Sequence, residues 1–140
     1  MEISEAKEFI RQNHHGVLVA QKKDGSLQMT LVTPTLSTDG QVIVTARERT
    51  YKVKNIRRNP QVSLLVFGDK FHGSNYIQVD GKAEVVDHPA AMDIVLDWHR
   101  QIRGKPEDWD EIRQKTLAEG RIAIKIAIEK CGPQNRSRAG

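Results

Sequence analysis

Hydrophobic and polar residues alternate along several short stretches of the chain, which is the pattern of a half-buried β-strand. In residues 76–86, Ile77, Val79, Ala83 and Val85 share one face, and in residues 121–128 every second residue is isoleucine. Residues 62–67 form a nearly continuous apolar run, which favours a strand buried on both faces. Three further strands are predicted at residues 17–21, 27–36 and 41–45.

Apolar residues at helical spacing predict helices between these strands. They cover a first segment that ends near residues 13–16, a short segment at 51–58, and two longer segments at 88–102 and 107–119. Asp24-Gly25 is typical of a hairpin turn, and Gly81 indicates a bulge or bend within its strand. Pro34 lies inside a predicted strand, which favours an edge or a bulge at that point.

The order of these elements indicates the class of fold. Strands joined by short turns, with helices kept apart from them, are typical of an antiparallel barrel with helical additions. We therefore expect a mainly β, α+β fold with six strands. A single domain is expected over residues 1–131, followed by a flexible basic tail at residues 132–140. No GxGxxG motif follows the first strand, which excludes a Rossmann site.

The composition narrows the class of protein further. The chain has 140 residues, of which 38% are hydrophobic and 29% charged, as in a soluble globular domain. No apolar run approaches the roughly 20 residues that cross a bilayer, and the first residues do not resemble a signal peptide. The single cysteine, Cys131, excludes an internal disulfide. We expect a cytoplasmic protein without a membrane partner.

Basic residues gather where a predicted strand passes into the short helix at 51–58. Arg47 and Arg49 precede the helix, Thr50 is its expected cap, and Lys52 lies in its first turn. Free amide groups and the helix dipole favour an anion at such a point, and a phosphate is the natural ligand. The net charge of +4 agrees with an anionic partner. A solvated basic helix face is the alternative, and spacing alone leaves both open.

Other candidate chemistry is weak. Thr30, Thr33 and Thr35, with Pro34, could supply hydroxyl and backbone groups to a planar ring, but the residues alone favour an ordinary β-branched strand. The histidines show no metal-binding spacing, so we expect no metal site. No catalytic motif is present, and catalytic residues stay unassigned; any enzyme activity would therefore depend on a cofactor. Few aromatic residues are available for base stacking, which disfavours a nucleic-acid partner.

Several segments in order carry a family resemblance. Residues 51–66 (YKVKNIRRNPQVSLLV) and 79–85 (VDGKAEV) resemble the pyridoxamine 5'-phosphate oxidase-like family, whose fold is the FMN-binding split barrel. Residues 102–113 (IRGKPEDWDEIR) and 120–124 (GRIAI) are similar to its branch of reductases that depend on the deazaflavin coenzyme F-420. The resemblance extends from Ser4 to Ile128.

The resemblance implies a homodimer of split barrels with a cofactor groove at the subunit interface. Lys52 matches the family's phosphate-contacting lysine, and Thr50 lies beside it. The other matching positions are Thr45 before the helix, Thr33, Pro34 and Thr35 beside the ring, and Tyr76 on a strand that a partner subunit offers to the groove. Tyr51 departs from the arginine that the flavin-binding oxidases often carry, and many close relatives have an aromatic residue in place of Pro34.

The function implied is hydride transfer between coenzyme F-420 and a small organic acceptor. The cofactor's phosphate would lie at Thr50 and Lys52, and its acidic tail would follow Arg47 and Arg49. Two alternatives stay open. The first is a protein that binds flavin mononucleotide (FMN) as the oxidases of the family do, and the second is a cofactor-binding protein without catalysis.

Overall fold

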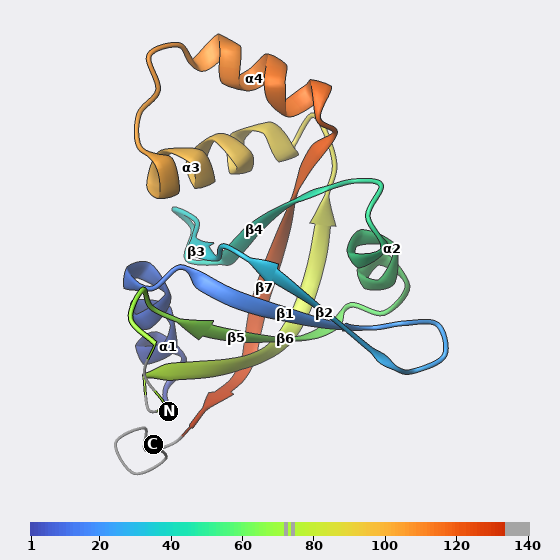
Figure 1. The fold of residues 1–140 in the computed structure, drawn as a ribbon, viewed down its shortest axis with the longest axis vertical. Helices are drawn as coiled ribbons and strands as arrows, with labels where there is room; N and C mark the ends of the chain where they lie inside the picture. The colour runs from blue at the N-terminus through green and yellow to red at the C-terminus, as the bar shows by residue number, and fades with distance from the viewer. Residues whose placement is uncertain (72, 74, 134–140) are drawn as a thin grey trace.

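A curved antiparallel sheet forms the body of the protein in the computed structural model, which describes residues 1–71, 73 and 75–133 (Figure 1). The sheet has seven strands in the order β2-β1-β5-β6-β7-β4-β3. Their bounds are β1 (His15–Gln21), β2 (Leu27–Val32), β3 (Thr35–Leu36), β4 (Val42–Arg47), β5 (Gln61–Phe67), β6 (Tyr76–Val86) and β7 (Arg121–Gly132). Because β2 and β3 are the two edges, the sheet is a barrel that stays open.

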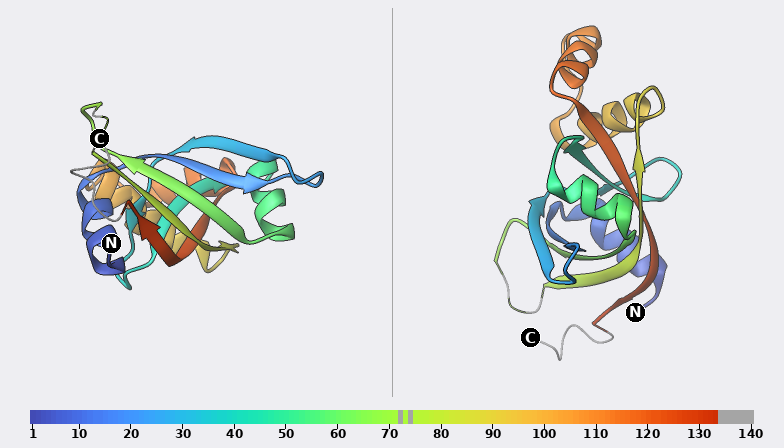
Figure 2. Two further views of the ribbon diagram at one scale, coloured as in Figure 1. Left: turned by 90° about the horizontal axis from the view of Figure 1, so that it is seen from below. Right: turned by 90° about the vertical axis from the view of Figure 1, so that its right-hand side faces the viewer.

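Four helices cover the openings of this sheet: α1 (Ile3–Gln12), α2 (Tyr51–Arg58), α3 (Ala91–Arg103) and α4 (Trp109–Ala118). Helices α3 and α4 stack together at one end, near the start of β7, whereas α1 lies toward the opposite end of that strand (Figure 1). The sheet curves so that β1 and β2 lie on one side and β7 on the other, with α2 across the opening between them (Figure 2). No helix among the described residues is long and apolar enough to cross a membrane.

Alternation along the strands builds the core. In β5, Val62, Leu64 and Val66 are buried, and the residues between them face outward and are only partly covered, so the expectation that this strand is buried on both faces is wrong. The same rule turns Ile122, Ile124 and Ile126 of β7 inward. Burial of one such side chain contributes roughly 1.5 to 3 kcal/mol, so the period-two pattern is enough to fix which face of each strand is inside.

The expected split-barrel fold is therefore confirmed, with one strand more than expected. The predicted strand at 27–36 is divided into β2 and β3, which pair with different neighbours, β1 and β4. The division falls at Thr33-Pro34, where proline supplies no amide hydrogen to continue the ladder. At the other end, β7 continues to Gly132, which pairs with Gln78 of β6. The predicted tail thus loses its first residue to β7, and residues 134–140 lie outside the described part of the chain.

The bulge predicted at Gly81 is confirmed. The pairing of β6 with β7 shifts by one residue between Asp80 and Gly81. A β-carbon on Gly81 would lie 2.0 Å from the carbonyl oxygen of Ala127. Glycine is required here because the two backbones approach too closely for any side chain.

One outward face of the sheet is apolar. On the edge strand β2, Leu27, Met29 and Leu31 point outward, and Leu31 is 83% exposed. Across the sheet, Leu31 lies beside Val17 of β1, which in turn lies beside Leu65 of β5. We call these five residues the outer apolar face. Contiguous exposed apolar surface of this kind is typical of a protein contact.

Candidate functional site

The end of β4 and the start of α2 form a tight corner. Thr50 is the residue before the helix, as predicted, and its hydroxyl donates a hydrogen bond to the carbonyl oxygen of Arg47 at 2.9 Å. The hydroxyl is turned back toward the strand and makes no cap hydrogen bond to the helix. No acidic residue lies in the first turn. The first amide groups of α2 therefore stay available to an anion.

Lys52 has the most informative environment at this corner. Its side chain is half-buried, and it forms no ion pair or hydrogen bond with any residue in the described part of the chain. Burial, and secondly the positive charge of Arg121, lower the pKa of Lys52 below the ordinary lysine value. A buried ammonium group that faces another cation is unfavourable unless an anion joins it. Lys52 is therefore placed to bind a negatively charged ligand.

Arg121, the first residue of β7, completes the corner. Its backbone lies opposite that of Arg47 in the pairing of β7 with β4. Its guanidinium donates a hydrogen bond to the hydroxyl of Thr45 at 3.2 Å. The same guanidinium forms an ion pair with Glu119 at 3.2 Å. We call Thr45, Arg47, Thr50, Lys52 and Arg121 the anion corner.

The structure thus brings four of the predicted residues together and adds one that sequence reasoning missed. Arg121 shows no signal in the sequence beyond its place before an alternating strand. Its position follows from the pairing of β4 with β7, which is a property of the fold. Arg49 is exposed in the link between Arg47 and Thr50.

The predicted ring-binding segment is held mainly by the fold itself. Thr35 is 1% exposed, and its hydroxyl donates to Gln101 of α3 at 2.9 Å. The carbonyl oxygen of Thr33 accepts from Trp98 Nε1 at 2.8 Å. Pro34 is buried, and its carbonyl oxygen lies 3.0 Å from a ring nitrogen of His14. Within one chain, α3 and the segment after α1 occupy the polar groups of Pro34 and Thr35, and contact of these two residues with a cofactor ring stays a prediction.

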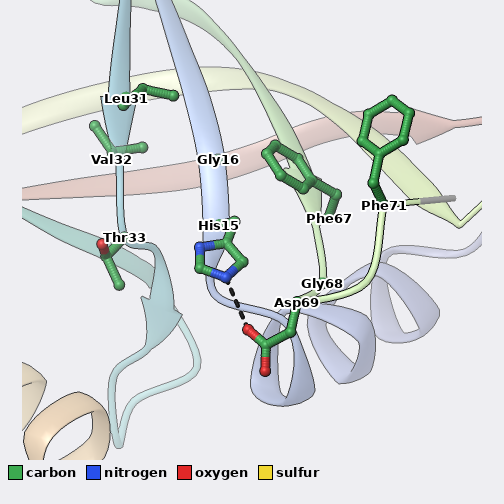
Figure 3. A pocket seen from close by; sticks show the side chains of 9 residues that line it. All are labelled: His15, Gly16, Leu31, Val32, Thr33, Phe67, Gly68, Asp69 and Phe71. Carbon is green, nitrogen blue, oxygen red and sulfur yellow. Dashed lines mark hydrogen bonds and ion pairs between the residues drawn. The ribbon is translucent and has the colours of Figure 1, made fainter.

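Thr33 lies differently, because it lines a hollow of about 500 Å³ beside β1, β2 and β5 (Figure 3). Phe67 and Phe71 lie on one side of it and Leu31 on the other. His15 points toward Asp69, and their nearest atoms are 2.8 Å apart. We call it the His15 hollow. It combines apolar walls with one polar pair, as ligand sites commonly do.

Tyr76 does not join either site within one chain. It lies at the start of β6 beside Gln78, Cys131 and Pro133, which line a separate hollow of about 310 Å³. Its cross-strand neighbour is Phe67, so Tyr76 is near the His15 hollow without being part of it. The predicted role of Tyr76 involves a partner subunit and stays a prediction.

A further basic groove lies between the β1–β2 hairpin and α2. It has a volume of about 740 Å³, and its cations include Lys22, Lys54 and Arg58. Met29 and Tyr51 supply apolar surface, and the Lys54 ammonium lies 5.4 Å from the centre of the Tyr51 ring. Lys54 and Arg58 of α2 therefore line a groove, whereas Arg57 forms an ion pair with Asp87 outside it.

The last two candidates are the thiol of Cys131 and a metal-binding cluster. The Cys131 thiol donates to the carbonyl oxygen of Met1 at 3.4 Å, and burial raises its pKa, which lowers its nucleophilicity at neutral pH. Within the described residues, no group of three or more His, Cys, Asp and Glu side chains is arranged to hold a metal ion.

An open antiparallel barrel with a short helix after its fourth strand is the split-barrel architecture. Residues 3–135 match the model of the family described as pyridoxamine 5'-phosphate oxidase. The chain belongs to this family.

Solved structures agree on the fold. A conserved hypothetical protein from Mycobacterium tuberculosis is 21% identical, with a TM-score of 0.77, and the match covers 94% of this chain and 82% of that one. A structure named F-420 reductase is 19% identical, with a TM-score of 0.69 and coverage of 90% and 94%. An FAD-binding protein from Mesorhizobium loti is 20% identical, with a TM-score of 0.59 and coverage of 94% and 92%.

Proposed function

We propose that the protein is an oxidoreductase that uses coenzyme F-420, a deazaflavin, and that the anion corner binds the phosphate of this cofactor. The observation that carries the proposal is Lys52: it is half-buried, without an ionic partner among the described residues, and close to a second cation. A phosphate between Lys52 and the first amide groups of α2 would neutralise both charges. Membership of the family and the similarity to an F-420 reductase support this choice.

The residues present fit the cofactor. Lys52 and the start of α2 would hold the phosphate, and the exposed Arg47 and Arg49 nearby in the chain would be available to an acidic tail. When bound, the deazaflavin supplies hydride transfer chemistry. The protein's own contribution is to orient the cofactor and to exclude water, because the described residues show no catalytic set that would act without it.

A second copy of the chain would cover the outer apolar face and the His15 hollow. Leu31 belongs both to the outer apolar face and to the wall of the His15 hollow. Pairing two chains through the outer apolar face would remove Leu31 and Met29 from water and close the hollow on its open side. A homodimer through this face therefore accounts for the exposed apolar residues.

FMN is the second candidate cofactor, since it also carries a phosphate group. The similarity to an FAD-binding protein favours this possibility. Tyr51, which replaces the arginine that the flavin-binding oxidases often carry beside the phosphate, favours the deazaflavin.

Equilibrium titration of the purified protein with coenzyme F-420 and with FMN, followed by cofactor fluorescence, tests the proposal. We expect saturable binding of coenzyme F-420 at a lower concentration than FMN. Tighter binding of FMN, or a yellow flavin that purifies with the protein, would contradict the deazaflavin assignment. Reoxidation of the bound reduced deazaflavin by added acceptors, followed by absorbance, separates an enzyme from a storage protein.

A further inference from the structure

A second basic pocket lies between α3, α4 and the start of β7, at the end of the molecule where the two helices stack (Figure 1). It has a volume of about 360 Å³. Three cations line it, namely Arg103 of α3, Lys115 near the end of α4 and Arg121 of β7. We call this space the helix-pair pocket. None of the residues predicted from the sequence to bind a cofactor lines this pocket, and it is separate from the His15 hollow.

The charges in the helix-pair pocket do not cancel. Glu119 forms an ion pair with Arg121. Arg103 and Lys115 form no ion pair with any carboxylate in the described residues. Their charges reach the imidazole of His99, whose pKa is lowered first by burial and then by Arg103 and Lys115. Two uncompensated cations therefore converge on one hollow beside a histidine that resists protonation.

The floor of the pocket is apolar and fixed in place. Trp98 is 8% exposed, and its indole nitrogen donates to the carbonyl oxygen of Thr33. Arg103 lies 5.9 Å from the centre of the Trp98 ring, so the floor also orients a cation. Val95 and Ile112 supply the remaining apolar surface. A ligand that fits must combine an apolar body with negative charge.

We propose that the helix-pair pocket binds an organic carboxylate, with its charged group between Arg103 and Lys115 and its apolar part on Trp98. A carboxylate accepts hydrogen bonds from both side chains, and a flat or aliphatic body matches the indole floor. Two sources supply this chemistry: a free small carboxylate, or the acidic tail of the proposed cofactor. Arg121 lines this pocket and also belongs to the anion corner, so the two sites are contiguous.

Intrinsic fluorescence reports directly on this pocket. The chain has two tryptophans. Trp98 lines the pocket, and Trp109 packs edge-on against His99 with ring centres 5.9 Å apart. Titration of the cofactor-free protein with benzoate, and in parallel with the uncharged benzamide, measures the contribution of the carboxylate. We expect saturable change with benzoate, at least about tenfold tighter than with benzamide.

Matched variants locate the binding. Lys115→Met and Arg103→Met each remove one cation, and each is expected to weaken benzoate binding by about tenfold or more. Lys105→Met makes the same charge change in the exposed link between α3 and α4 and should leave binding unchanged. Circular dichroism checks folding. Lys115 is on an exposed part of α4, so its variant keeps the test valid if loss of the Arg103–Trp98 contact disturbs the fold.

The two sources are separated by a second probe, N-acetyl-diglutamate. Tighter binding of the glutamyl peptide than of benzoate supports the pocket and identifies the cofactor tail as its source, whereas the reverse order supports the pocket and a free carboxylate. Equal binding of benzoate and benzamide, or unchanged binding in Lys115→Met, overturns the proposal. These measurements use protein without cofactor, so their failure is distinct from a failure of the titration with coenzyme F-420.

Discussion

Replacement of Lys52 by methionine is the sharpest test of the anion corner. Methionine keeps much of the length and the apolar stem of lysine while removing its charge. Because the ammonium group has no ionic partner among the described residues, the substitution breaks no ion pair within the protein. Any loss of cofactor binding would therefore report a contact between Lys52 and the ligand.

The expected magnitude follows from the kind of contact. A hydrogen bond to a charged partner contributes about 1.5 to 3 kcal/mol. Since about 1.4 kcal/mol corresponds to a factor of ten, we expect Lys52→Met to raise the Kd for the cofactor by roughly 10- to 150-fold. The Kd should rise for coenzyme F-420 and for FMN alike, because both carry a negatively charged phosphate.

Stability is expected to change in the opposite direction. In the ligand-free protein, Lys52 is unfavourable because of its burial and the nearby charge of Arg121. The free energy of unfolding of Lys52→Met, measured by urea denaturation, should therefore equal or exceed that of the original protein. Weaker binding together with unchanged or higher stability is the signature of a residue kept for its ligand.

A matched control and a refuting result complete the test. Lys105→Met removes one positive charge from an exposed link far along the chain and should change neither property. An unchanged Kd for both cofactors in Lys52→Met would refute the assignment of the phosphate to this corner. Lower stability with unchanged binding would show that Lys52 has a structural role instead.

Three further predictions concern Lys52, Gly81 and Leu31. Because the pKa of Lys52 is lowered and only its charged form holds a phosphate, cofactor affinity should fall as pH rises through that lowered pKa, and Lys52→Arg should move the fall to higher pH, as measured by titration across pH. Gly81→Ala should reduce the free energy of unfolding by about 1 to 3 kcal/mol or more in urea denaturation, since its β-carbon would meet the backbone of Ala127. Leu31→Glu should yield folded monomers in light scattering after size exclusion, because the side chain is exposed within one chain; a stable dimer would contradict the proposed interface.

The strands of this fold could be predicted because their signal is local. Period-two alternation located β6 and β7, a continuous apolar run located β5, and the glycine in β6 marked its bulge. The prediction failed in detail at Pro34, where one expected strand became two. The sequence indicates that a ladder is interrupted at proline, but only the assembled sheet determines that the residues after it pair with β4.

Part of the candidate site could likewise be predicted from local sequence, and part depends on how the helices pack. Thr50 and Lys52 are neighbours at a helix start, so their proximity was readable from the chain. Thr33 and Thr35 alternate with a proline on one segment, and nothing local shows that Trp98 and Gln101 occupy their polar groups. Those contacts depend on where α3 packs, which is decided by the burial of its apolar face.

The role of Arg121 can be inferred only once the fold is known. As a lone arginine before a strand it carries no functional signal. Pairing of β7 with β4 places Arg121 against Thr45. Burial, and secondly the charge of Arg121, lower the pKa of Lys52. The side chain of Arg121 also lines the helix-pair pocket. Glu119 compensates only one positive charge there. The remaining positive charge is shared between the anion corner and the helix-pair pocket. A ligand with two separated anionic groups would neutralise the charge in each of them.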